Sequence, residues 1–316
     1  MLRSALWIVA ASFAVPLAVS GARPVRDQAA QTPGPARRVA ITIDDGPVVG
    51  EMKDLANFQR ISAGLTGSLQ AEKVPATIFI NERQLNVPGQ RDARVAALEA
   101  WLDAGFDLGN HTYSHPDINQ VPLDAFTADV TRGETVVRAA LAARKRELRY
   151  FRHPFLRTGP TPEIKRGMQA FLDGRGYRIA PVTIDNADYL YAAVYTRPPH
   201  RDRVRREYVA YMESVVAFFE QRAVEVAGRE FPQVLLLHAN QLNADLMPDL
   251  LAMFRRRGYG FVSLEQALAD PAYAMTDGYA GRGGFSWIHR WSQTKGMPSK
   301  GEPEPPAWVQ EAMASR

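Results

Sequence analysis

The chain has 316 residues, of which 46% are hydrophobic and 23% are charged, and its formal net charge at pH 7 is +4. This composition is that of a folded globular protein, and the length allows one large domain or two modest ones. Lys and Arg are interspersed with Asp and Glu, which favours a solvated surface over a nucleic-acid groove. The absence of cysteine excludes a disulfide framework and a thiolate zinc site.

Residues 1–22 predict a secretory signal peptide. Arg3 is followed by an apolar run over residues 5–19, and Ser20 and Ala22 form a small-x-small cleavage site. The run is shorter than the ~20 residues that a membrane-spanning helix needs. We therefore expect an exported protein, periplasmic or extracellular, with no stable membrane insertion after signal cleavage. Residues 23–37 are rich in Pro, Gln and charge without apolar periodicity, which predicts a disordered leader.

From residue 38 onward, short apolar runs alternate with amphipathic segments of helical length. Strands are expected at residues 39–43, 76–80, 106–109, 148–151, 177–183, 234–237 and 260–262. Helices are expected at residues 91–104, 124–146 with Asp124 as N-cap, 162–175, 203–226 and 244–257. Strands that alternate with helices predict parallel β/α units, and this number of strands favours a closed or nearly closed barrel. We expect an α/β fold with a single main domain over residues 38–270.

Two segments lie outside this alternation. Residues 190–231, between the fifth and sixth strands, are long and aromatic, and they either narrow a groove or line it. Residues 271–316 are rich in Gly, Pro and polar residues, yet the stretch GGFSWIHRWSQT at 283–294 holds two tryptophans. We expect a C-terminal extension that is partly ordered and packs on the domain, with about the last twenty residues loose, as chain ends often are.

The polar residues that stand out all follow the ends of expected strands. They are Asp44 and Asp45 after the first strand, His111 and His115 after the third, Arg152 after the fourth, Asp185 and Asp188 after the fifth, and His238 after the sixth. The carboxyl ends of the strands are where β/α barrels assemble their active sites. This placement predicts one shared site.

His111 and His115 stand four residues apart, a spacing that puts two imidazoles within reach of one cation on a helical turn. A carboxylate from Asp44 or Asp45 completes a set of two histidines and one carboxylate, which suits a catalytic zinc or a similar divalent ion. Plain structural roles stay open for single residues: a turn at the Asp-Gly pair, surface histidines in the loop, and a core position for His238. The chain contains no G-x-S-x-G elbow, phosphate-binding glycine loop or H-E-x-x-H helix.

Over roughly residues 38–268 the chain resembles the polysaccharide deacetylases of carbohydrate esterase family four, the NodB-homology group. TIDDGP is similar to the first motif of that family, T-F-D-D-G-P, and HTYSH, RHPF, DNADY and LLLH are similar to H-[ST]-x-x-H, R-x-P-[FY], D-x-x-D-W and L-x-x-H. Ile43 replaces the Phe of the first motif and Tyr189 the Trp of the fourth. The resemblance implies a distorted (β/α)7 barrel with residues 38–270 as its catalytic domain.

The resemblance also implies a role for each matching residue. Asp45, His111 and His115 would bind the metal, Asp44 would be the general base and His238 the general acid. Arg152 would tether Asp44, Asp188 would orient His238, and Phe155 would give a backbone N–H to the oxyanion pocket. Tyr189 and Asn240 are expected near the substrate. Neighbouring charges should then lower the pKa of Asp44 and raise that of His238.

The implied function is an exported hydrolase that removes N-acetyl groups from an acetylated polysaccharide or oligosaccharide. It would use one divalent metal ion with its bound water, zinc first and cobalt or nickel as alternatives. An O-acetyl esterase or a small-molecule amide hydrolase could use the same site, and a catalytically silent glycan-binding barrel is the alternative from another class. A nucleic-acid partner is not expected.

Overall fold

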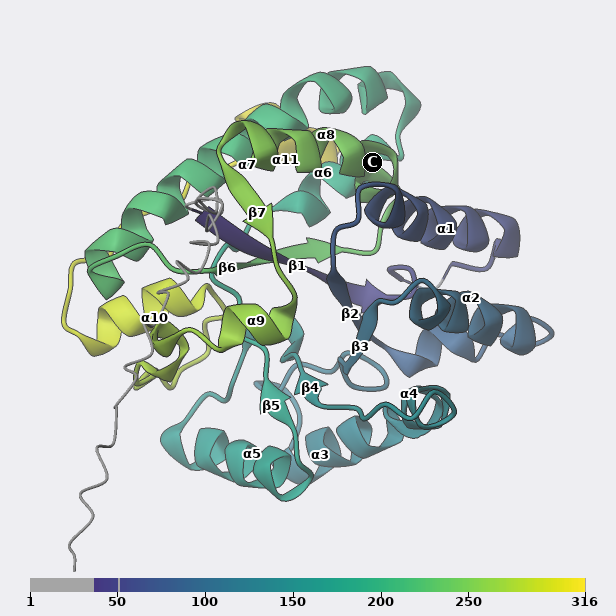
Figure 1. Cartoon of the computed structure of the whole chain (residues 1–316), viewed down its shortest axis with the longest axis horizontal. Helices are drawn as coiled ribbons and strands as arrows, with labels where there is room; N and C mark the ends of the chain where they lie inside the picture. The colour runs from purple at the N-terminus through teal and green to yellow at the C-terminus, as the bar shows by residue number, and fades with distance from the viewer. Residues whose placement is uncertain (1–36, 51, 316) are drawn as a thin grey trace, which may run out of the picture. The chain divides into compact units, whose positions relative to one another are not determined.

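The computed structural model describes residues 37–50 and 52–315 of the chain (Figure 1). The signal peptide expected at residues 1–22 and the leader up to residue 36 lie outside the described residues and stay predictions. The first strand, β1, spans Arg37–Gly46, so it begins one residue before the expected start of the domain.

The sheet consists of seven strands, and all their pairings are parallel. The order is β5-β4-β3-β2-β1-β6, with β7 paired to β1 outside this path. All seven predicted strands are confirmed within a few residues. The strands after β1 are β2 (Ala76–Ile80), β3 (Asp107–Asn110), β4 (Tyr150–Phe151), β5 (Arg178–Ile179), β6 (Gln233–His238) and β7 (Tyr259–Phe261).

The sheet curls into an irregular barrel. Beyond β5 the chain approaches β6, where the Leu236 N–H donates to Ile184 O at 3.1 Å and the Ile184 N–H donates to Val234 O at 3.0 Å. β7 pairs only with the first three residues of β1, Arg37 to Val39. The barrel is distorted in two places: a single bridge between Ile184 and Leu235 joins the segment after β5 to β6, and β7 pairs only with the start of β1. The expected distorted (β/α)7 barrel is confirmed.

Helices surround the strands in Figure 1. The helices expected at residues 91–104, 162–175, 203–226 and 244–257 are present, the last two with earlier starts. The helices are α1 (Leu55–Ala71), α2 (Arg91–Asp103), α3 (Leu123–Arg132), α4 (Thr135–Ala142), α5 (Pro162–Gly174), α6 (Asp188–Tyr195), α7 (Pro198–Ala227), α8 (Gln241–Arg256), α9 (Leu264–Leu268), α10 (Trp287–Thr294) and α11 (Ala307–Ala314). Short 3₁₀ turns span Glu82–Leu85, Pro154–Leu156 and Pro271–Ala274.

The single helix expected over residues 124–146 is wrong, because the chain breaks at Gly133 into α3 and α4. Pro122 occupies the N-cap position of α3, and Asp124 lies in its first turn instead. A Cβ atom on Gly133 would lie 2.4 Å from the carbonyl carbon of Thr112. Glycine therefore lets the end of α3 approach the backbone of the loop that carries His111.

The expectation of a loose chain end is also wrong. Residues 307–314 form α11, whose Val309 and Ala312 are buried. The Trp308 indole Nε1–H donates to Glu207 Oε2 at 2.8 Å, which joins α11 to α7. A guanidinium N–H of Arg197 donates to Ser315 O at 2.6 Å. These contacts give the end of the chain a fixed place on the domain.

The aromatic segment between β5 and β6 forms α6 and α7. Tyr191, Tyr195 and Tyr208 are buried, and the rings of Tyr191 and Tyr208 lie 5.4 Å apart. These side chains therefore pack the two helices together and line no groove. Tyr211 alone of the four tyrosines named in this segment borders the cavity described below.

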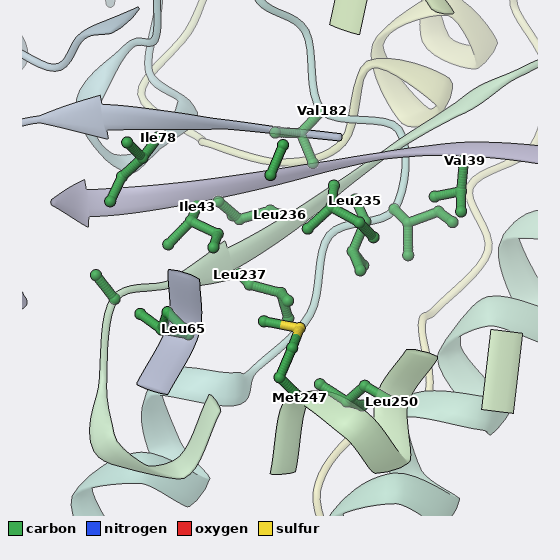
Figure 2. Packing of buried hydrophobic residues seen from close by; sticks show 14 of the residues in the cluster. Val39, Ile43, Leu65, Ile78, Val182, Leu235, Leu236, Leu237, Met247 and Leu250 are labelled. Atoms are coloured by element: carbon green, nitrogen blue, oxygen red, sulfur yellow. The ribbon is translucent and has the colours of Figure 1, made fainter. Parts of the chain in front are cut away.

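The core lies between the strands and the helices that cover them. Figure 2 shows Leu237 of β6 beside Met247 of α8, with Ile43 of β1 near Leu65 of α1. Residues on both faces of β1 are buried, as expected of a parallel strand in the centre of such a fold. Among residues 37–50 and 52–315, no helix is both long and apolar enough to cross a membrane.

Candidate active site

Two carboxylates stand at the carboxyl end of β1. Asp44 is opposite His238 in the register with β6, and the ladder with β2 is interrupted between Ile43 and Gly46. Asp45 has a φ of 60°, in the left-handed region, so the strand turns sharply between the two side chains. A Cβ on Gly46 would lie 2.5 Å from the Ile78 side chain, so this turn needs glycine. Asp44 is 2% exposed and Asp45 faces the histidines.

Asp45, His111 and His115 form a compact set of metal-ligand types. Asp45 Oδ1 lies 3.6 Å from His111 Nε2 and 3.5 Å from His115 Nε2. One potential ligand atom from each residue lies within 4.8 Å of the others. The sequence left the carboxylate open between Asp44 and Asp45, and the structure places Asp45 against both imidazoles.

The loop between the two histidines is held by its own polar groups. The Thr112 N–H donates to Asn110 Oδ1 at 2.6 Å, and the His115 N–H donates to Thr112 Oγ1 at 3.0 Å. Thr112 and His115 both have positive φ values, 71° and 59°. The folded loop thus brings the His111 and His115 rings to a centroid distance of 4.9 Å.

A hydrogen bond fixes the tautomer of His111. Its Nδ1 lies 2.8 Å from Arg152 O, a carbonyl that can only accept, so Nδ1 carries the proton. The lone pair is then on Nε2, which faces Asp45. Burial and the neighbouring His115 hold the pKa of His111 well below its ordinary value, and burial also lowers the pKa of His115. Both rings are therefore neutral, as metal ligands must be.

Arg152 lies beside Asp44 in a fully buried pair. A guanidinium nitrogen, Nη1, donates to both oxygens of Asp44 at 3.1 and 3.2 Å. The other donors reach Thr42 Oγ1 at 3.0 Å and Ala180 O at 2.7 Å. Every nitrogen of the guanidinium thus has a partner, and Arg152 has 0% exposure. This arrangement fixes both the position and the orientation of the carboxylate.

The pKa of Asp44 moves opposite to the direction expected from the sequence. Burial raises this pKa to about 6, and the charge of Arg152 opposes the rise without cancelling it. The expectation counted only the neighbouring charge and missed the cost of taking the carboxylate out of water. Asp44 is therefore a stronger base than a carboxylate at the surface.

Asp188 and His238 form a second buried pair across the β6 end of the site. Asp188 Oδ1 lies 2.6 Å from His238 Nδ1, and Asp188 Oδ2 accepts the His238 backbone N–H at 2.8 Å. Burial by itself lowers the pKa of His238, but the charge and hydrogen bond of Asp188 outweigh it and raise the pKa to about 10. This direction agrees with the expectation. The imidazole is therefore held as a cation at neutral pH.

Asn243 is a site residue whose role the sequence did not reveal. Its Nδ2 donates to Asp188 Oδ2 at 2.6 Å, and its Oδ1 accepts from the Tyr208 hydroxyl at 2.8 Å. Asn240, expected near the substrate, lines the cavity, but its Oδ1 caps α8 by accepting the Asn243 N–H at 2.9 Å. No recognised motif includes Asn243. Its place in the stretch HANQLNAD after His238 put it near the site, but nothing in the sequence indicated the contact with Asp188.

These residues border a cavity of about 1130 Å³. Two large aromatic side chains at the cavity are unusually open, Phe155 with 49% and Tyr189 with 56% exposure. The Phe155 ring lies 4.5 Å from the ring of His115, and the Tyr189 ring lies 6.3 Å from that of His238. The two exposed aromatic rings therefore stand beside the set of Asp45, His111 and His115 and beside the Asp188–His238 pair. Asp185 also borders the cavity, and burial raises its pKa to about 7.

The C-terminal extension supplies part of the cavity wall, which the sequence did not predict. Phe285, His289 and Glu302 border the cavity, and His289 Nε2 lies 2.9 Å from Glu302 Oε1. The extension lies far along the chain from every motif, so motif spacing gave no sign of it. His153 is buried, with 1% exposure, and lies edge-on to Phe151.

Comparison with known proteins finds deacetylases similar to this chain. The family model described as polysaccharide deacetylase matches residues 31–165. A chitin deacetylase from Colletotrichum lindemuthianum is 24% identical over 236 residues, 73% of this chain and 79% of that protein. A chitin deacetylase from Pestalotiopsis sp. is 27% identical over 152 residues, 48% of this chain and 43% of that protein. The chain thus spans less than half the length of this second relative.

A solved structure of a polysaccharide deacetylase from Bacillus cereus matches with a TM-score of 0.50 and 18% identity, over 71% of this chain and 91% of that one. This likeness concerns the fold. The barrel and its site thus occur in a chain whose relatives are deacetylases, which are hydrolases of the class that acts on carbon–nitrogen bonds. Over residues 31–165 the chain is thus similar to the polysaccharide deacetylase family.

Proposed function

We propose that the protein is a divalent-metal-dependent deacetylase that removes N-acetyl groups from an acetylated glycan. The main support for the proposal is that a set of metal-ligand residues and two buried charged pairs lie together at one end of the barrel. Asp45, His111 and His115 form a metal-ligand set, and the Arg152-bound Asp44 and the Asp188-bound His238 lie on the adjacent strands β1 and β6. Amide hydrolysis needs both an activated water and a protonated leaving nitrogen.

The donor set fits a divalent ion. One carboxylate oxygen and two neutral imidazole nitrogens within 4.8 Å of one another are the mixed ligands that catalytic zinc accepts, and cobalt or nickel would suit them too. With three protein ligands, positions stay open for water and substrate. When bound, such an ion polarises the acyl oxygen and lowers the pKa of water to about 7.

The chain supplies the proton transfers. Asp44, held ionised in place by Arg152, takes a proton from the water as its oxygen bonds to the acyl carbon. The backbone N–H of Phe155 is the proposed donor to the oxyanion that results. His238 then gives its proton to the amide nitrogen, so that the C–N bond breaks and acetate and an amine leave. A base and an acid with pKa values of about 6 and about 10 are in the required protonation states at neutral pH.

The substrate class follows from the aromatic rings. Phe155 and Tyr189 are the exposed rings at the cavity, and an exposed ring offers an apolar face on which a sugar can lie. The chitin deacetylase relatives support an N-acetylated amino-sugar polymer or oligomer. The experiment is an acetate-release assay on N-acetylated chitooligosaccharides, peptidoglycan fragments and O-acetylated xylan, with the metal-stripped protein reloaded with zinc, cobalt or nickel.

The alternatives make different predictions in the same assay. An O-acetyl esterase does not need a protonated leaving nitrogen, so His238→Ala would keep most of its activity on acetylated xylan. Loss of all activity in that variant favours the amide. A catalytically silent barrel would release no acetate from any substrate of the panel with any of the three metals.

We also propose that the protein is exported. The support is the sequence alone, in which Arg3, the apolar run over residues 5–19 and the small residues at 20 and 22 have the order of a secretory signal. Amino-terminal sequencing of protein recovered from the periplasm or medium tests it. A chain that starts at residue 23 is expected, and recovery of the uncleaved chain from the cytoplasm would contradict it.

A further inference from the structure

The C-terminal extension contacts the turn that carries Phe155. In that turn the Leu156 N–H donates to His153 O and the Arg157 N–H donates to Pro154 O, both at 3.1 Å. Phe155 and Leu156 have φ values of 55° and 53°, in the left-handed region that non-glycine residues rarely adopt. Two such residues in succession persist only where the surrounding structure imposes the conformation. The turn is therefore shaped by its neighbours.

Gly284 is one of those neighbours. A Cβ atom built on Gly284 would lie 1.7 Å from Phe155 O, far inside van der Waals contact. The backbone of the extension therefore presses directly on the peptide that links Phe155 to Leu156. Only glycine permits this approach.

Arg290, on α10, contacts the same turn. One of its guanidinium nitrogens donates to Leu156 O at 2.8 Å and another to Thr158 Oγ1 at 2.9 Å. Asp277 Oδ2 lies 3.0 Å from the guanidinium and provides the opposite charge. The side chain has 0% exposure and lies 4.5 Å from the Trp287 ring centroid. A buried cation with this many partners holds its acceptors in fixed positions.

The extension is itself anchored to the barrel. The Trp287 N–H donates to Val182 O at 2.8 Å, and the Ser286 hydroxyl donates to Thr183 O at 2.8 Å. These acceptors lie in the stretch between β5 and the bridge to β6. α10 also packs against α7 (Figure 1). The contact on the Phe155 turn is therefore backed by the barrel wall.

We propose that Gly284 and Arg290 are positioning residues for the reaction, which hold the turn that carries Phe155 so that the N–H of Phe155, on the preceding peptide bond, meets the oxyanion. This inference rests on the proposed function, because it assigns the extension a part in that reaction. Oxyanion donors act only if they are preorganised, and a misplacement of 1 Å can cost about 100-fold in rate. The extension is thus part of the catalytic structure.

The test compares Gly284→Ala with Gly301→Ala, a matched change in the same extension. No atom lies within 4 Å of the position that a Cβ on Gly301 would occupy, and Gly301 has no positive φ. For acetate release by the zinc-loaded protein, Gly284→Ala is expected to lower kcat about 10- to 100-fold with KM within about twofold, since the donor acts on the transition state. Gly301→Ala is expected to match the unmodified protein, and zinc affinity measured by calorimetry should be equal in all three.

A second pair keeps the test decisive if Gly284→Ala does not fold. Arg290→Lys keeps the positive charge, but an ammonium group cannot reproduce the paired hydrogen bonds of the guanidinium to Leu156 O and Thr158 Oγ1. Arg222→Lys is its control, because Arg222 is 2% exposed and ties α7 to the extension at Pro298 O, at 2.7 Å, without contact to the Phe155 turn. A role confined to stability predicts equal kcat values and lower melting temperatures in both variants.

The outcomes separate this inference from the proposed function. If the unmodified protein releases no acetate, the proposed function fails and this inference with it. If the unmodified protein is active and kcat is the same in Gly284→Ala and Gly301→Ala, or in Arg290→Lys and Arg222→Lys where Gly284→Ala is unfolded, the inference alone is overturned.

Discussion

The Asp188→Asn substitution tests the acid of the proposed mechanism most sharply. It keeps the size of the side chain and removes the charge that lies 2.6 Å from His238 Nδ1. In the unmodified protein the pKa of His238 is about 10, with Asp188 as the group that raises it against the effect of burial. Without that charge, burial is opposed only by the weaker effects of Asp45 and Asp44, and the pKa should fall toward the ordinary histidine value of about 6.5.

The size of the effect follows from the two pKa values. At pH 8.5 a histidine with a pKa of about 6.5 is about 1% protonated, whereas one with a pKa of about 10 is almost fully protonated. If the protonated imidazole is the acid, kcat for acetate release at pH 8.5 should fall about 100-fold, and its alkaline limb should move from near pH 10 to near pH 6.5. At pH 6 the loss should be much smaller.

The measurement is a pH profile of kcat for acetate release from an N-acetylated oligosaccharide between pH 5.5 and 10.5, with the metal held saturating. Asp185→Asn is the matched control, because Asp185 borders the same cavity and makes no hydrogen bond to His238. An alkaline limb that stays near pH 10 in Asp188→Asn, as in the control, would refute the assignment of His238 as the acid.

The Asp188–His238 pair should also make the free energy of unfolding depend on pH. Because the folded pKa of His238, about 10, lies above the unfolded value, its protonation stabilises the fold fully below about pH 6.5, and this contribution disappears as pH rises through about 10. Urea unfolding of Asp188→Asn should therefore show its largest deficit near pH 6, and the deficit should shrink toward pH 10. Asp44→Asn should keep zinc binding, measured by calorimetry, while kcat falls about 100-fold or more from the loss of the base, and near-normal turnover would contradict that role. Gly133→Ala should push on the Thr112 backbone, 2.4 Å from the new Cβ, and weaken zinc affinity through the His111 loop, whereas Gly174→Ala, with free space around its Cβ, should not. Unchanged zinc affinity in Gly133→Ala would show that this close approach does not position the loop.

The strands could be predicted because a strand that is buried on both faces appears in the sequence as a continuous run of apolar residues. The apolar runs at residues 39–43 and 234–237 became the centres of β1 and β6, which lie side by side in the barrel. Asp44 and His238 could then be located at strand ends, where β/α barrels gather functional groups. Local pattern and topology were enough for this part of the site.

Other features depend on contacts between distant segments and leave no local trace. The break between α3 and α4 follows from the approach of Gly133 to Thr112, which a helical pattern does not contain. The upward shift of the pKa of Asp44 follows from complete burial, which is a property of the folded surroundings. The need for glycine at position 284 also cannot be seen in the local sequence, because it arises from the close approach to Phe155 O, more than a hundred residues earlier in the chain.

The most direct test of the central claim is metal reconstitution of the deacetylase activity. The metal-stripped protein and the Asp45→Ala variant are titrated with zinc while acetate release from an N-acetylated chitooligosaccharide is followed. We predict that the stripped protein is inactive, that activity returns and levels off at about one zinc per chain, as expected for a single three-ligand site, and that Asp45→Ala recovers little at the same zinc concentration. Full acetate release without metal, or equal recovery in Asp45→Ala, would contradict the account.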